Sequence, residues 1–123
     1  MNNLEFAEKM QARTMVFAVS VVKFFVRLPQ TDEARVPGKQ FLRAGTSVGA
    51  NYRAVCRAKS DADFISKMGT VVEEADESAF WLELMENAGV CSSVSIQPLK
   101  IEASELLRIF STSLNTSKRN AGR

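Results

Sequence analysis

The chain of 123 residues has the length of one domain with one hydrophobic core. Its hydrophobic fraction of 46% and charged fraction of 24% are ordinary for a soluble globular protein, and three prolines and six glycines favour a few long elements. There is no histidine, and the two cysteines form no CxxC motif, so the usual zinc and di-iron ligand sets and the commonest general base are missing. We therefore expect no enzyme, with no catalytic residue, metal, cofactor or small-molecule substrate.

The net charge of +2 conceals a strong segregation of charge along the sequence. Residues 1–59 carry ten Lys or Arg and four Asp or Glu, residues 60–90 carry one and eight, and residues 91–123 carry five and two. Segments of opposite charge attract one another when they lie side by side. The chain is therefore predicted to pair a basic segment with an acidic one.

The isolated cysteines and the apolar stretch at residues 14–28 bear on the cellular compartment of the protein. Cys56 and Cys91 lie far apart and no secretory leader is recognisable, which predicts two free thiols in the reducing cytoplasm. The apolar stretch contains Lys23 and Arg27, and at about fifteen residues it is too short to cross a bilayer. We interpret it as a buried helix and expect no contact with a membrane.

The first predicted helix spans residues 3–28, from an asparagine N-cap to the helix-ending Pro29. Its expected core seam is Phe6, Met10, Phe17, Val21, Phe24 and Leu28. Further apolar residues widen this stripe beyond the needs of one packing contact, namely Val16, Val19, Val22, Phe25 and Val26. The helix therefore either lies at the centre of its own bundle or forms a subunit interface.

The second predicted helix spans residues 39–58, after a linker at residues 30–38 in which Pro37-Gly38 is typical of a turn. Its expected core face is Phe41, Gly45, Val48, Tyr52, Val55 and Cys56. A basic stripe lies on its flank and is the candidate nucleic-acid surface: Lys39, Arg43, Arg53 and Arg57, followed by Lys59.

The same helix contains two pairs of small or polar residues, each spaced by four positions. Gly45 and Gly49 each cost about 1 kcal/mol relative to Ala inside a helix, which predicts that another helix backbone approaches them closely. Ser47 and Asn51 are interpreted as a structural polar contact between helices or subunits.

The third predicted helix is about 28 residues long and has the best-defined ends. Ser60 is the expected N-cap, and Gly89 is placed to end the helix as C′. Its expected seam is Phe64, Met68, Val71, Ala75, Ser78, Leu82 and Met85. The opposite side mixes acids with large apolar groups, which predicts an oligomer interface made of Glu73, Glu77, Phe80, Trp81 and Leu84.

The fourth predicted helix follows a serine-rich turn at residues 91–95 and ends near residue 116, with Pro98 in its first turn. Its expected seam is Leu99, Ala103, Leu106, Leu107, Phe110 and Leu114. Residues 117–123 are expected to be a frayed cationic tail. Four helices with short connections predict a single all-α domain, an antiparallel up-down-up-down four-helix bundle.

Two groups of residues carry a resemblance to a known family. They are Arg43, Ser47, Val48, Gly49, Ala50, Asn51, Arg53, Ala54 and Arg57, followed by Ser60, Asp63, Phe64, Glu74, Glu77 and Leu84. This pattern, over nearly the whole chain, resembles the small four-helix bundle proteins named after intervening sequences in bacterial 23S rRNA genes. Their shape is similar to that of the accessory variability determinant proteins of diversity-generating retroelements. The resemblance implies a homopentameric ring with a basic surface that binds nucleic acid.

Two departures from the family pattern are visible. The family's Ser-Ile-Pro is replaced here by Ser47-Val48-Gly49, and the net charge is modest.

Two functions remain open on the sequence. In the first, an assembly of the chain binds the backbone of RNA or DNA through the basic stripe; Tyr52 is the sole aromatic among these cations and points inward, so base stacking is not expected. In the second, the arginines form salt bridges to the third helix, and the protein is an interaction scaffold without a nucleic-acid role. Catalysis is disfavoured even at Glu73, Glu74 and Glu77, because no nucleophile has a paired base.

Overall fold

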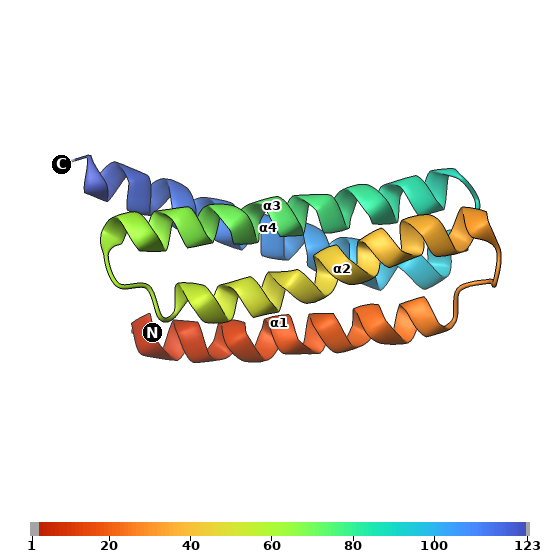
Figure 1. Cartoon of the computed structure of the whole chain (residues 1–123), viewed down its shortest axis with the longest axis horizontal. Coiled ribbons are helices and arrows are strands. Elements are labelled where there is room, and N and C mark those ends of the chain that lie inside the picture. The colour runs from red at the N-terminus through yellow and green to blue at the C-terminus, as the bar shows by residue number, and fades with distance from the viewer. Residues whose placement is uncertain (1–2, 123) are drawn as a thin grey trace.

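The computed structural model describes residues 3–122, which form an all-α four-helix bundle (Figure 1). The helices are α1 (Asn3–Val26), α2 (Asp32–Val55), α3 (Asp61–Asn87) and α4 (Ser93–Ala121). Each helix runs antiparallel to the one before it, so the up-down-up-down bundle predicted from the sequence is confirmed.

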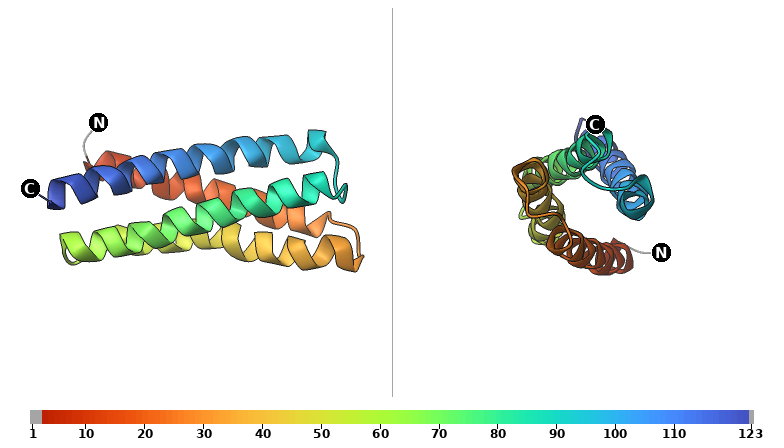
Figure 2. Two further views of the ribbon diagram at one scale, coloured as in Figure 1. Left: turned by 90° about the horizontal axis from the view of Figure 1, so that it is seen from above. Right: turned by 90° about the vertical axis from the view of Figure 1, so that its right-hand side faces the viewer.

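The bundle is open between its first and last helices. Helices adjacent in sequence pack along their lengths, whereas α1 and α4 meet at few positions. Viewed end-on in Figure 2, the four helices form a C with α1 and α4 at its two tips. Arg13 of α1 crosses this opening and donates two hydrogen bonds to Glu102 of α4, from Nε at 2.8 Å and from Nη2 at 2.7 Å.

The predicted core faces are largely confirmed, except that Phe6, Phe24, Phe64 and Leu107 are only partly buried and Cys56 is exposed. Phe25 rather than Phe24 is fully packed in α1, and Phe24 lies half-buried with its ring edge-on to Phe41 at a centroid distance of 5.7 Å. Cys56 is exposed because α2 ends at Val55 and the chain turns away there. The buried apolar side chains of α3 and α4 follow the predicted seams, with Ile96 added at the start of α4.

The predicted start of the second helix was wrong, because α2 begins at Asp32 and not after a linker. Its first turn carries two acids, which favour the positive end of the helix dipole, and the Thr31 carbonyl accepts from the Arg35 N–H at 2.8 Å. Pro37 lies near the helix start and removes one hydrogen bond there. Gly38 is buried, and a Cβ on it would lie 2.4 Å from Leu28 Cδ1. Pro37-Gly38 is therefore a packing contact with the end of α1 and not a turn.

The predicted ends of α3 are confirmed. The Ser60 hydroxyl accepts from the Asp63 N–H at 3.0 Å, and the Asp63 carboxylate accepts in return from the N–H of Lys59, the residue before the N-cap, at 3.0 Å, an arrangement close to a capping box. At the other end Gly89 has a φ of 72°, and the Val90 N–H bonds the Met85 carbonyl at 3.1 Å in a Schellman motif.

Helix α4 starts after Ser92, whose hydroxyl accepts from the Ser95 N–H at 3.1 Å. Pro98 is the sixth residue of α4, so it lies in the second turn and not in the first turn as predicted. The helix continues to Ala121, well beyond the end at residue 116 that the sequence predicted. Lys118 and Arg119 stand in its last turn, where cations favour the negative end of the helix dipole. Residues 117–121 are thus helical and not the expected frayed tail.

Candidate nucleic-acid interface

The five cations of the predicted nucleic-acid surface all have exposed side chains, but the structure divides them into separate groups. Lys39 lies near the start of α2, Arg43 one turn further on, and Arg53 near the helix end. Arg57 and Lys59 lie in the connection to α3. At a rise of about 1.5 Å per residue, Lys39 and Arg53 are roughly 21 Å apart along the axis.

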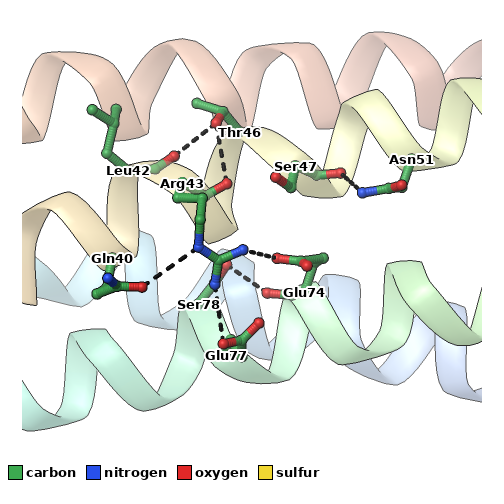
Figure 3. Close-up of polar contacts among 9 residues, drawn as sticks. All are labelled: Gln40, Leu42, Arg43, Thr46, Ser47, Asn51, Glu74, Glu77 and Ser78. Atoms are coloured by element: carbon green, nitrogen blue, oxygen red, sulfur yellow. Dashed lines mark hydrogen bonds and ion pairs between the residues drawn. The ribbon is translucent and has the colours of Figure 1, made fainter.

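Arg43 is engaged by the acids of α3 (Figure 3). Its guanidinium lies 3.2 Å from a Glu74 carboxylate oxygen and 3.0 Å from a Glu77 oxygen, and its Nε bonds the Gln40 side chain at 3.5 Å. The hydrogen bond to Glu77 is the main reason that the pKa of Arg43 is raised. This is the charge pairing between the basic and acidic segments that the sequence predicted, and it commits one of the five cations to the fold.

The other four predicted cations form no ion pair with any residue between 3 and 122. Three of them, Arg53, Arg57 and Lys59, follow one another where α2 ends and α3 begins. In Figure 1 this connection lies at the same end of the bundle as the end of α4, which adds Lys118 and Arg119. The sequence had placed these two cations in a frayed tail, and only the continuation of α4 brings them to this end.

We call this set the cationic end of the bundle: Arg53, Arg57, Lys59, Lys118 and Arg119. Acids also occur here, because α3 begins with Asp61 and Asp63, and α1 begins at the same end of the bundle with Glu5 in its first turn. Asp63 is occupied, since its carboxylate accepts from Lys67 Nζ at 2.8 Å as well as from the Lys59 N–H, and these bonds lower its pKa. The five cations therefore outnumber the acids at the ends of the helices that meet here.

The two helix glycines lie where α1 approaches α2, as the sequence predicted. A Cβ on Gly45 would be 2.7 Å from Val21 Cγ2, and one on Gly49 would be 3.2 Å from Thr14 Oγ1 and 3.4 Å from the Thr14 carbonyl oxygen. Outside this contact runs a shallow groove of about 250 Å³ whose lining includes Met15 of α1 and Arg53 of α2. The groove joins the basic flank of α2 to the outer face of α1.

Ser47 and Asn51 lie on the side of α2 that faces α3 (Figure 3). The Asn51 side-chain amide donates to the Ser47 carbonyl at 2.8 Å, so within one chain the pair is bonded inside its own helix. A role for the two residues at a subunit contact stays a prediction.

The predicted oligomer interface on α3 contains both packed and exposed side chains. Glu77 binds Arg43, and Trp81 is half-buried against the core with its ring edge-on to Phe80 at 5.0 Å. Phe80 is 53% exposed and Leu84 36%, and Glu73 is exposed. The indole N–H of Trp81 is buried and has no hydrogen-bond partner within residues 3–122.

A larger apolar surface lies on the outer face of α1, which the sequence had proposed either for the bundle centre or for a subunit interface. Its exposed side chains are Met15 at 50%, Val16 at 66%, Val19 at 44%, Val22 at 44% and Val26 at 71%. Of the apolar residues that widen the α1 stripe, Phe25 alone belongs to the core. The four valines face away from the bundle.

Other kinds of site were sought among the described residues. No group of three or more Cys, Asp or Glu side chains within residues 3–122 is arranged to hold a metal ion. Neither of the two thiols is in a disulfide. None of the four helices is long and apolar enough to span a bilayer.

These features define a class of protein: a small, open four-helix bundle with a basic second helix, an acidic third helix, and exposed apolar side chains on α1 and α3. The sequence model of the 23S rRNA-intervening sequence proteins matches residues 8–112. The chain belongs to this family, as the resemblance carried by its second and third helices had indicated.

A solved structure supports this assignment. It is the crystal structure of a protein of unknown function from the S23 ribosomal protein family of Bacteroides thetaiotaomicron, with 31% sequence identity and a TM-score of 0.78. The similarity covers 85% of this chain and 96% of that chain. Comparison with curated proteins finds no match.

Proposed function

We propose that the protein is a non-enzymatic, cytoplasmic homo-oligomer, a pentamer as the family resemblance implies, that binds the backbone of RNA or DNA. The binding surface is the cationic end of the bundle, repeated once in every subunit. Contacts to phosphate need exposed cations that are not already in ion pairs within the protein. Because the patch is repeated in each subunit, the affinity of the whole assembly exceeds that of one subunit.

The observation that carries this proposal is the division of the predicted basic stripe. Arg43 is neutralised by two glutamates, whereas Arg53, Arg57 and Lys59 are exposed and unpaired within the described chain. Contacts from these side chains to phosphate would be sequence-independent, because no exposed aromatic ring lies among them for base stacking.

The second candidate function is an interaction scaffold with no nucleic-acid role. The ion pair between Arg43 and Glu74 favours it, because carboxylates of α3 neutralise an arginine of α2. The exposed apolar side chains of α1 and α3 favour it as well, because such side chains mark protein contacts. In this case the free cations serve protein contacts only. Both candidates share self-association and differ in whether a polyanion binds.

A salt titration of binding separates the two candidates. Single-stranded RNA and duplex DNA are titrated with the protein by filter binding, and the logarithm of affinity should fall linearly with the logarithm of salt. Replacing Arg53, Arg57 and Lys59 together by Gln should weaken binding and lower the slope by roughly 2–3. Arg108→Gln, an exposed arginine already paired with Glu105 on α4, is the matched control and should leave the slope unchanged.

Failure takes a defined form in each measurement. A flat salt dependence, or no binding tighter than about 100 µM, would exclude the nucleic-acid function and leave the scaffold. Light scattering tests the assembly separately: we expect about five times the chain mass of 13.6 kDa, and a monomer at micromolar concentration would contradict self-association.

A further inference from the structure

Two outer faces of the bundle are apolar and carry opposite charge. The first, which we call the α1 face, is the strip Met15, Val19, Val22 and Val26, whose members share one side of the helix at spacings of three and four. The second, the α3 face, is centred on Phe80 and Leu84, also four positions apart. Exposed apolar side chains that lie next to one another mark interaction surfaces more often than scattered ones do.

Cations flank the α1 face on both sides. Lys23 and Arg27 follow on α1 itself, on the side away from α2. Lys39 flanks the other side, because its neighbour Gly38 contacts the end of α1 at Leu28 and Phe25. The sequence from residue 15 to residue 28 contains no acid, so nothing on this helix segment balances the positive charge.

The α3 face is surrounded by acids. Glu73, Asp76 and Glu83 are exposed beside Phe80 and Leu84 and form no ion pair with the residues that the structure describes. The segment from residue 70 to residue 87 contains no Lys or Arg. The other acids between residues 70 and 87 are already paired, Glu74 and Glu77 with Arg43 and Glu86 with Lys100.

The α3 face is also hollowed. A depression of about 440 Å³ is lined by Phe80, Glu83, Leu84, Asn87 and Ala88 at the end of the helix. The depression is apolar on most of its wall and has a carboxylate at its edge. A branched apolar side chain beside a cation fits this shape and charge, and Val26 next to Arg27, with 71% of its surface exposed, is such a group.

We propose that the α1 face of one copy docks on the α3 face of the next copy, with Val26 entering the depression and the Lys and Arg side chains facing Glu73, Asp76 and Glu83. This inference rests on the proposed self-association and specifies its geometry. The contact is heterologous: the α1 face of each subunit binds the α3 face of the next subunit. A ring forms if the rotation from one subunit to the next adds up to a full turn. A symmetric contact is disfavoured, because α1 against α1 brings cations together and α3 against α3 brings acids together.

The test uses two variants, each with one broken face. Val19→Asp combined with Val22→Asp removes the α1 face, and Phe80→Asp combined with Leu84→Asp removes the α3 face. Each variant alone should be a monomer by light scattering. Mixed in equal amounts they should form a dimer of twice 13.6 kDa, because one intact face of each kind is available and the two broken faces repel each other.

Two controls keep folding and docking apart. Circular dichroism should show unchanged helix content, because all four side chains are at least one third exposed. Ile101→Asp, at an apolar residue on α4 that is 62% exposed, should keep the mass of the wild type. Trp81, the one tryptophan of the chain, adjoins Phe80, so its fluorescence should shift to the blue when the variants are mixed.

The outcomes distinguish the docking geometry from self-association itself. A wild type that assembles while the mixed variants stay monomeric would overturn the proposed pairing of faces and leave the oligomer standing. An assembly that survives in either variant alone would overturn it as well, in favour of a symmetric contact through the remaining face. A monomeric wild type would remove both the assembly and the docking.

Discussion

Helix α1 packs along α2, most closely at two glycines, whereas it meets α4 at few positions, one of which is the ion pair between Arg13 and Glu102. At Gly45 and Gly49 the α2 backbone lies so close to Val21 and Thr14 that a single added carbon would be within 3.2 Å of its neighbours. The buried Thr14 hydroxyl is satisfied inside its own helix, where it donates to the Met10 carbonyl at 2.8 Å. Across the opening to α4, the Arg13 and Glu102 side chains are 34% and 28% exposed.

The difference between these two sides shows how the fold is held and where it can be changed. The α1–α2 seam depends on shape, because close packing leaves no room for a Cβ at Gly45 and little room for one at Gly49. The α1–α4 side depends on two long side chains at the water's edge, which add little energy and mainly fix orientation. Substitutions in the seam should therefore be costly, and those at the opening should be mild.

The largest effect is expected in the packed seam. Gly45→Leu should destabilise the protein by about 1–3 kcal/mol, because the new side chain collides with Val21 and overpacks the contact. Gly49→Leu should cost less, since its Cβ meets Thr14 at 3.2 Å and the groove outside offers the side chain some room. Ala50→Leu, at an exposed position beside Gly49, should stay within about 0.5 kcal/mol of the wild type.

Thermal and urea unfolding of the three variants provide the measurement. Equal melting temperatures for Gly49→Leu and Ala50→Leu would mean that α1 and α2 move apart at little cost in stability. The α1–α2 and α1–α4 contacts would then differ less in their tolerance of substitution than the distances indicate.

A smaller effect is expected at the opening. Arg13→Met, Glu102→Gln and the double variant form a cycle in which the coupling should be about 0.5–1 kcal/mol at low salt, since the pair is bidentate but one third exposed. The coupling should shrink in 1 M salt, where charges are screened within about 3 Å. A coupling above about 2 kcal/mol would show that the α1–α4 side is closed in solution like a buried pair.

The sequence predicted what depends on local chemistry. The ends of α3 follow from Ser60 and Gly89, residues whose hydrogen-bonding and conformational preferences act within a few positions. The core seams follow from apolar spacing in the same way. Glycines four apart predicted a close helix approach because no local role justified them inside a helix.

The errors lie where distant residues decide. Pro37-Gly38 has the local chemistry of a turn, and only its contact with Leu28 makes the helix start earlier. The pairing of the basic second helix with the acidic third helix was predicted, and Arg43 with Glu74 and Glu77 confirms it. Which cations stay unpaired depends on the register of α2 against α3, which helix periodicity within one segment does not contain. The opening between α1 and α4 likewise has no sequence signal, because it depends on how four separate segments pack against one another.

The smallest effect concerns an ion pair across a packed seam, which completes the comparison with the opening. Glu86 of α3 accepts from Lys100 Nζ of α4 at 2.6 Å, and this bond is the main reason that the pKa of Glu86 lies below its ordinary value of 4.5. A carboxyl with a lowered pKa in the folded state stabilises the protein fully above pH 4.5 and loses that contribution as the pH falls through the lowered value.

Lys100→Met removes the cation and keeps most of the side chain. The urea midpoint of this variant should lie slightly below that of the wild type at pH 7. The difference between the two midpoints should narrow at pH 3, because Glu86 is then largely protonated in the unfolded chains and increasingly protonated in the folded proteins. A difference that stays constant from pH 7 to pH 3 would show that Lys100 acts through the packing of its aliphatic stem on α3. The α3–α4 contact would then resemble the α1–α2 contact at Gly45 and Gly49, where packing determines the stability. It would not resemble the opening between α1 and α4, where the ion pair does.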